Sequence, residues 1–229
     1  MTECTMTDTL TDQLRIFVEQ EKIQIDPDFK IYKSAAHALV DCVFSSMAKF
    51  DAVVKPLLIR LEQRLPDRHM LTLSELVEDI DALGVEKYAK EVLNLQRISG
   101  RLKVQIVRDA AEFLISQGIE TKADFADLSA REAACIVLYE LVDTVRGIGP
   151  ALSRYLMLLL GRENYIKPDT ILTRLLIRIG GGELKPHDIK RMTDAIRTVA
   201  DEMDTTPARL DNALWLYESQ RPKERDKPN

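Results

Sequence analysis

The 229-residue chain has few of the residues that build metal centres and disulfide frameworks. Its three cysteines, Cys4, Cys42 and Cys135, are scattered without a CxxC spacing, which is typical of free thiols in a reducing compartment. The three histidines are also far apart and show no ligand spacing. We therefore expect neither disulfides nor a metal site made of side chains.

Long apolar runs are missing as well. The longest, 155–160, is too short to cross a bilayer, and the first residues lack the basic and apolar parts of a signal segment. We expect a soluble, intracellular protein (cytoplasm, nucleoid or nucleus) with no membrane partner. The formal net charge of −5 argues against coating nucleic acid by charge alone, but it allows local phosphate contacts.

Glycine is scarce, at nine residues, and strand-like alternation of apolar and polar residues is rare. Apolar residues recur instead at helical spacing, for example within 34–44, 50–64 and 100–117. Ser74 is a candidate N-cap of a helix that ends before Gly84. These patterns predict an all-α protein of about ten helices, followed by a charged, disordered tail over 221–229.

One segment stands out, the run Val-Arg-Gly-Ile-Gly-Pro at 145–150, which precedes an apolar helix. Two glycines around one apolar residue make a tight turn. The unpaired amides and partial positive charge of the next helix can then hold a phosphate. An ordinary connection between two helices, in which glycine relieves steric strain, is the alternative. Asp169 follows Gly149 by twenty residues and stands before another apolar helix, where it is a good N-cap.

The glycine turn, the helix after it and Lys167-Pro168-Asp169 together resemble the helix-hairpin-helix/Gly-Pro-Asp superfamily of DNA glycosylases, typified by endonuclease III. The resemblance covers most of the chain. It implies two helical domains with a cleft between them, one made of 30–163 and the other of 1–29 with 164–220. It also implies duplex DNA as the partner and base excision repair as the process.

The resemblance assigns the catalytic role to Asp169. Its carboxylate would stabilise positive charge on the sugar as the base leaves, or help to deprotonate the attacking water. A helix cap without chemistry is the alternative. The turn would bind a DNA phosphate, and in some members its carbonyls hold a monovalent cation. The candidate DNA-binding residues are Gly147, Ile148, Gly149 and Ala151 in the turn, and Arg101, Lys103, Arg154 and Lys167 beside the motifs.

Two features of the superfamily are missing from this chain. Bifunctional members carry a lysine two residues after the second glycine, where this chain has Ala151, so a Schiff base through this position is excluded. No cysteine follows Cys135, so the four-cysteine iron–sulfur cluster of other members is absent, and no cofactor is expected. The prediction is a monofunctional glycosylase that hydrolyses the N-glycosidic bond and leaves the strand intact.

Met47 stands where family members often place a side chain that fills the gap left by a flipped base. An apolar side chain suits insertion into the base stack. A methionine buried in the core is the alternative. Two other functions also remain open for the whole chain. One is a DNA-binding relative that has lost catalysis and serves as a lesion sensor or scaffold. The other is a helical protein-interaction domain whose hairpin no longer meets DNA.

Overall fold

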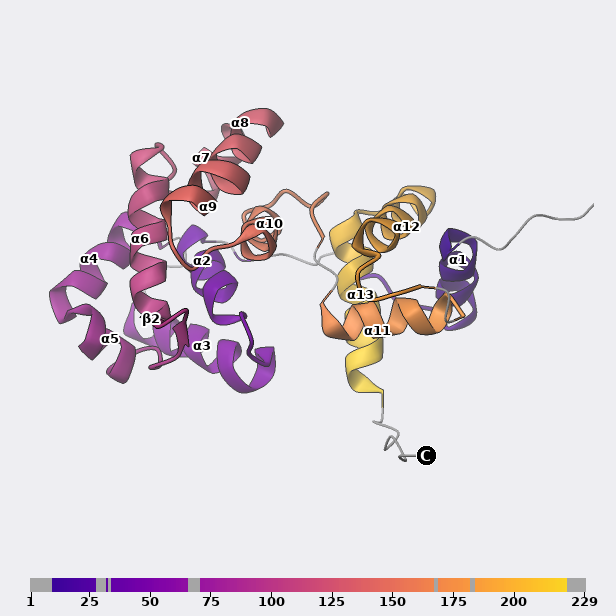
Figure 1. The fold of residues 1–229 in the computed structure, drawn as a ribbon, viewed down its shortest axis with the longest axis horizontal. Coiled ribbons are helices and arrows are strands. Elements are labelled where there is room, and N and C mark those ends of the chain that lie inside the picture. The colour runs from indigo at the N-terminus through magenta and orange to yellow at the C-terminus, as the bar shows by residue number, and fades with distance from the viewer. Residues whose placement is uncertain are drawn as a thin grey trace, which may run out of the picture. The chain divides into compact units, whose positions relative to one another are not determined.

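The computed structural model describes residues 10–27, 32, 34–65, 71–166, 169–181 and 184–221. Helices dominate these residues, and two short strands form one hairpin (Figure 1), which confirms the expected all-α class. Lys167 and the expected tail from residue 222 onward lie outside the described residues. In the described part of the chain, no helix combines the length and apolar character needed to cross a bilayer.

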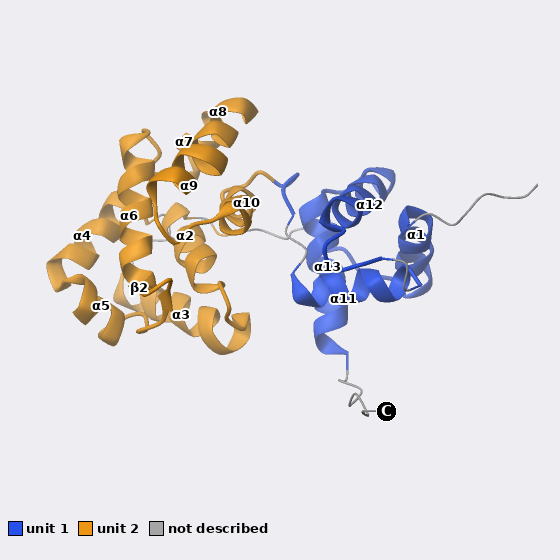
Figure 2. Cartoon of the chain, in the orientation of Figure 1, with its two compact units in different colours: residues 1–29, 163–229 blue, residues 30–162 orange. Residues whose placement is uncertain are grey.

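The chain divides into two compact units (Figure 2). Unit 1 joins residues 1–29 to 163–229, and unit 2 is the continuous stretch 30–162. The family resemblance had placed the second boundary one residue later, after 163. Each unit has its own helices and is described by itself.

Unit 1 is a small helical bundle around one apolar core. Its helices are α1 (Leu10–Gln20), α11 (Thr170–Ile179), α12 (Ile189–Glu202) and α13 (Pro207–Gln220). α1 packs against α12, and α11 packs against α13. Fully buried side chains from all four helices, including Leu14, Leu175, Ile196 and Leu214, fill the space between them. The N-terminal helix is thus held by the C-terminal third of the chain.

Unit 2 is arranged around α2 (Ala35–Phe44), whose ten residues are all buried. α2 packs against α6 (Lys103–Ser116) and α10 (Pro150–Leu159). The other elements are the π-helical segments η1 (Phe50–Val54) and η2 (Cys135–Glu140), the helices α3 (Lys55–Arg64), α4 (Leu73–Leu83), α5 (Val85–Glu91), α7 (Lys122–Asp127), α8 (Ala130–Ala134) and α9 (Leu141–Thr144), and the strands β1 (Arg97–Ile98) and β2 (Arg101–Leu102). Arg97 pairs with Leu102 in the antiparallel hairpin.

Side-chain caps set several helix starts. Thr72, not the expected Ser74, caps α4, because Thr72 and Glu75 bond to each other's backbone amides in a capping box. Ser74 instead donates to Glu120 Oε1 at 2.6 Å. A second capping box, between Thr121 and Asp124, starts α7, a six-residue helix that the apolar pattern did not predict.

Candidate nucleic-acid interface and carboxylate site

The turn between α9 and α10 is built around two glycines with different tasks. Gly149 is the N-cap of α10, which begins at Pro150. Gly147 has a φ of +116°, and a Cβ there would lie 2.5 Å from Ile106 Cδ1 on α6. Both conformation and space therefore require glycine at this position. Around Gly149 no atom lies within 4 Å of where a Cβ would stand, so this face of the turn is open.

The open face of the turn carries unused hydrogen-bond donors. The N–H groups of Gly147, Gly149 and Ala151 have no acceptor among the described residues. The first amides of a helix carry partial positive charge, so these donors suit a phosphate oxygen. Ile148 does not join them as expected, because its N–H donates to the Val145 carbonyl at 3.1 Å and its side chain is buried.

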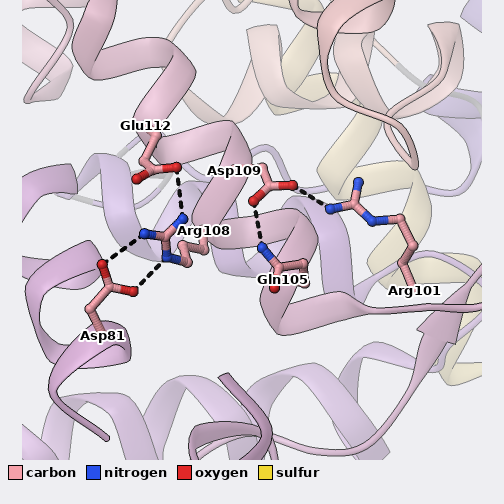
Figure 3. Close-up of polar contacts among 6 residues, drawn as sticks. All are labelled: Asp81, Arg101, Gln105, Arg108, Asp109 and Glu112. Carbon is pink, nitrogen blue, oxygen red and sulfur yellow. Dashed lines mark hydrogen bonds and ion pairs between the residues drawn. The ribbon is translucent and has the colours of Figure 1, made fainter. Parts of the chain in front are cut away.

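Arg101 supports the turn from within the protein. Its Nη1 donates to the Arg146 carbonyl at 2.6 Å, and its Nη2 forms a short ion pair with Asp109 on α6 (Figure 3). Gln105 Nε2 donates to the other Asp109 oxygen at 2.6 Å. The guanidinium is thus engaged on both sides. Arg101 fixes the β-hairpin against the turn and does not stand free for a DNA phosphate, contrary to the expectation.

Arg108 on α6 is also neutralised within unit 2. Its guanidinium makes two contacts with Asp81 on α4, at 2.5 and 2.8 Å, and one with Glu112 at 2.8 Å (Figure 3). Partly exposed ion pairs of this kind contribute little stability, but they consume positive charge. An anion at the turn would therefore be held by backbone donors more than by these two arginines.

Lys103 is buried, so the expected contact between Lys103 and DNA is wrong. Only 2% of the residue is exposed. Its Nζ donates to the carbonyls of Phe44 at 3.0 Å and Ser46 at 2.7 Å, and to Gln96 Oε1 at 2.8 Å. Burial lowers the pKa of the Lys103 ammonium to about 8. The amine serves the protein interior and cannot reach a surface phosphate.

Met47 follows Ser46 and is fully exposed, at 100%. Its φ of +55° lies in the left-handed region, which costs a non-glycine residue roughly 1–2 kcal/mol. A core position for Met47 is therefore wrong, and a strained turn presents its apolar side chain to solvent. Leu95, next to Gln96, is also exposed, at 59%. Helical periodicity gave no sign of Leu95, because it lies in the irregular segment before β1.

Two of the positively charged residues predicted to bind DNA remain to be placed, Arg154 and Lys167. Arg154 is exposed on α10, about one turn after Ala151. Lys167 lies outside the described residues.

Asp169 is fixed at the start of α11 in unit 1. Its Oδ1 accepts hydrogen bonds from the N–H groups of Ile171 at 2.8 Å and Leu172 at 2.9 Å, which confirms the predicted N-cap. Its Oδ2 accepts from Trp215 Nε1 on α13 at 3.0 Å. The residue is only partly buried. Three N–H donors thus hold the carboxylate in one orientation while part of it stays accessible.

Asp211 lies one turn before Trp215 on α13. Its Oδ1 is buried and has no hydrogen-bond partner in the described part of the chain. Burial, and after it the negative charge of Asp169, raise the pKa of Asp211 to about 8. At neutral pH Asp211 is therefore largely a neutral acid beside the Asp169 carboxylate. Asp211 and Trp215 are four residues apart on α13, and nothing in the local sequence indicates that both interact with Asp169.

Replacing Asp211 with asparagine is expected to stabilise the protein, and by more as the pH rises toward 8. Folding raises the pKa of Asp211 from 3.8 to about 8, so between these values the folded state holds a proton that the unfolded state releases. Stability of the natural chain therefore falls with rising pH in this window, whereas asparagine cannot ionise. Thermal unfolding at several pH values measures the difference. A constant difference in melting temperature across the window would contradict this account.

A cation at the glycine turn would rest on backbone carbonyls. Among the described residues, no three His, Cys, Asp or Glu side chains are grouped so that they could hold a metal ion. The Arg146 carbonyl already accepts from Arg101, and the Val145 carbonyl accepts from the Ile148 N–H. Each carbonyl has a second lone pair. A monovalent cation at this turn therefore stays a prediction.

Comparisons with known proteins give a family and no activity. A family model described as a domain of unknown function (DUF8548) matches residues 8–219, which is most of the chain. No curated protein and no solved structure matches.

Proposed function

We propose that this chain, which belongs to the DUF8548 family, a domain of unknown function, binds duplex DNA and hydrolyses the N-glycosidic bond of a damaged base. The observation that carries the proposal is the Asp169 carboxylate. Three N–H donors hold it at a helix N-terminus, twenty residues after the glycine turn. In the helix-hairpin-helix glycosylases, which the sequence resembles, the catalytic carboxylate also lies at a helix N-terminus after the glycine turn. The role in the cell would be base excision repair.

Asp169 is assigned two roles: its carboxylate stabilises positive charge, and it acts as a general base. As the bond between the base and C1′ breaks, positive charge develops on the sugar, and a prearranged carboxylate stabilises it without having to reorient. The same carboxylate can take a proton from the water that attacks C1′. The base leaves with the bonding electron pair. Because Ala151 offers no amine, the product is an abasic site in an unbroken strand.

The DNA contact assigned to unit 2 is local. The free amides at Gly149 and Ala151 would bind one phosphate, and Arg154 would add a charge-assisted hydrogen bond. Met47 would enter the base stack and occupy the space of the extruded nucleotide. Full exposure of Met47 favours this role, since an apolar side chain that packs against nothing has no structural task.

Gly149→Ala is expected to weaken duplex binding about tenfold at fixed salt. The added methyl meets no protein atom, so the fold tolerates it, but it would stand on the open face where the phosphate approaches. Fluorescence anisotropy with a labelled duplex measures the loss. Gly147→Ala is a contrasting variant for stability: its methyl meets Ile106, so it should lower the free energy of unfolding by about 1–3 kcal/mol. Unchanged binding by the Gly149 variant would argue against the phosphate site.

Met47→Gly is expected to weaken binding to a duplex with a missing base about tenfold, with little change in binding to intact duplex. The fold should be almost unaffected. Relief of the left-handed strain, roughly 1–2 kcal/mol, is offset by the greater freedom of glycine in the unfolded chain, roughly 0.5–1 kcal/mol. Equal losses on both duplexes would mean that Met47 does not act in the base stack.

The test of the whole proposal needs no knowledge of the damaged base. It compares affinity for an intact duplex with affinity for one that carries a cationic pyrrolidine in place of a nucleotide, at fixed salt. The pyrrolidine mimics the charged sugar of the transition state, so an active enzyme should prefer it about a hundredfold or more. Asp169→Asn keeps a residue that caps helices well but removes the charge, so it should lose most of that preference.

Trp215→Phe is the matched control for Asp169→Asn. It removes one hydrogen bond to the carboxylate and keeps the charge, so it should lose only part of the preference. Equal binding of the natural chain to both duplexes would support the DNA-binding relative without catalysis. Absence of binding to either duplex would support the protein-interaction domain.

A further inference from the structure

The ammonium of Lys103 is placed unusually for a lysine at the start of a helix. The first residue of α6 turns its side chain into unit 2, and Nζ lies 5.5 Å from the centre of the Phe44 ring. Each of the three ammonium protons has an oxygen acceptor within 3.0 Å, on Phe44, Ser46 and Gln96. The hydrogen-bonding capacity of the group is therefore fully used inside the protein.

Burial of the Lys103 ammonium lowers the stability of the folded protein. This cost favours a role for Lys103 in positioning other segments. A buried ammonium loses its hydration, and the three acceptors of Lys103 are neutral oxygens of two carbonyls and an amide. An apolar side chain would fill the same space without this loss. The amine instead links the segment at Phe44 and Ser46 to the segment at Gln96.

Lys103 links two segments that each carry an exposed apolar residue. Ser46, whose carbonyl it holds at 2.7 Å, is followed directly by Met47 on its left-handed turn. Gln96, whose side chain it holds at 2.8 Å, is preceded directly by Leu95. One buried ammonium therefore bonds to a neighbour of each exposed side chain, to the backbone of Ser46 before Met47 and to the side chain of Gln96 after Leu95.

We propose that Lys103 is a positioning residue that holds the Met47 turn, through Ser46 and together with Gln96, in the orientation in which Met47 enters DNA. This inference rests on the proposed function. A turn that was already ordered would lose little conformational entropy on binding, so more of the insertion energy would appear as affinity. Lys103 would thus strengthen DNA binding without touching DNA.

The test acts on Gln96, because Lys103→Met would leave buried oxygen acceptors without a donor and would disturb folding itself. Gln96→Leu removes one acceptor of the ammonium, whereas Gln96→Glu keeps an oxygen there and is the conservative control. Both variants are made in the full chain, with Met47 and again with Met47→Gly. Affinity is measured for the pyrrolidine duplex at fixed salt.

If Lys103 acts through Met47, Gln96→Leu should weaken binding about fivefold when Met47 is present and less than about twofold in the Met47→Gly background. Gln96→Glu should bind like the natural chain. Equal losses in both backgrounds would overturn the proposal, because the effect of Gln96 would then be independent of Met47.

A second measurement separates this inference from the proposed function. Amide hydrogen exchange of residues 46–48 in the protein without DNA should be faster in Gln96→Leu than in the natural chain or Gln96→Glu. Equal exchange in all three proteins would overturn the positioning role even if DNA binds. Faster exchange in a chain that binds neither duplex would leave Lys103 as the residue that orders this turn and would overturn the DNA function.

Discussion

The Asp169 carboxylate accepts hydrogen bonds from two helices that are far apart in sequence, the first amides of α11 and the indole of Trp215 on α13. These bonds fix its direction, and a fixed carboxylate stabilises developing positive charge without having to reorganise. Asp211 adds a second constraint, because its burial keeps it largely neutral and leaves one negative charge at the site. A neutral and an ionised carboxyl side by side are typical of sites where environment sets different roles.

In unit 2, two cationic side chains bind backbone carbonyls of the protein itself. Arg101 bonds to the Arg146 carbonyl of the glycine turn, and Lys103 bonds to the Ser46 carbonyl before Met47. Neither is free to meet a phosphate. Each instead fixes a segment whose own groups face outward: the amides of the turn in one case, and an apolar side chain in the other. If the proposed function holds, a chain with a formal net charge of −5 would bind DNA through a few such local contacts.

The sequence predicted features that depend on neighbouring residues. Gly84 and Asp169 stand at the helix boundaries that were expected from them, because caps and glycine turns act over three or four positions. It could not predict partners that come together only in the fold. Burial of Lys103 depends on carbonyls almost sixty residues away, and the Trp215 bond to Asp169 spans two helices. The exposure of Met47 likewise follows from its left-handed backbone, which residue types alone do not show.

The most direct measurement of the central claim is the release of bases. DNA treated separately with alkylating, oxidising and deaminating agents would be incubated with the natural chain and with Asp169→Asn. Abasic sites and strand breaks would then be counted. The account predicts new abasic sites in at least one of the treated DNAs, no additional breaks, and loss of both binding preference and base release in the Asp169 variant. Strand breaks formed by the enzyme, or abasic sites at the same rate with Asp169→Asn, would contradict it.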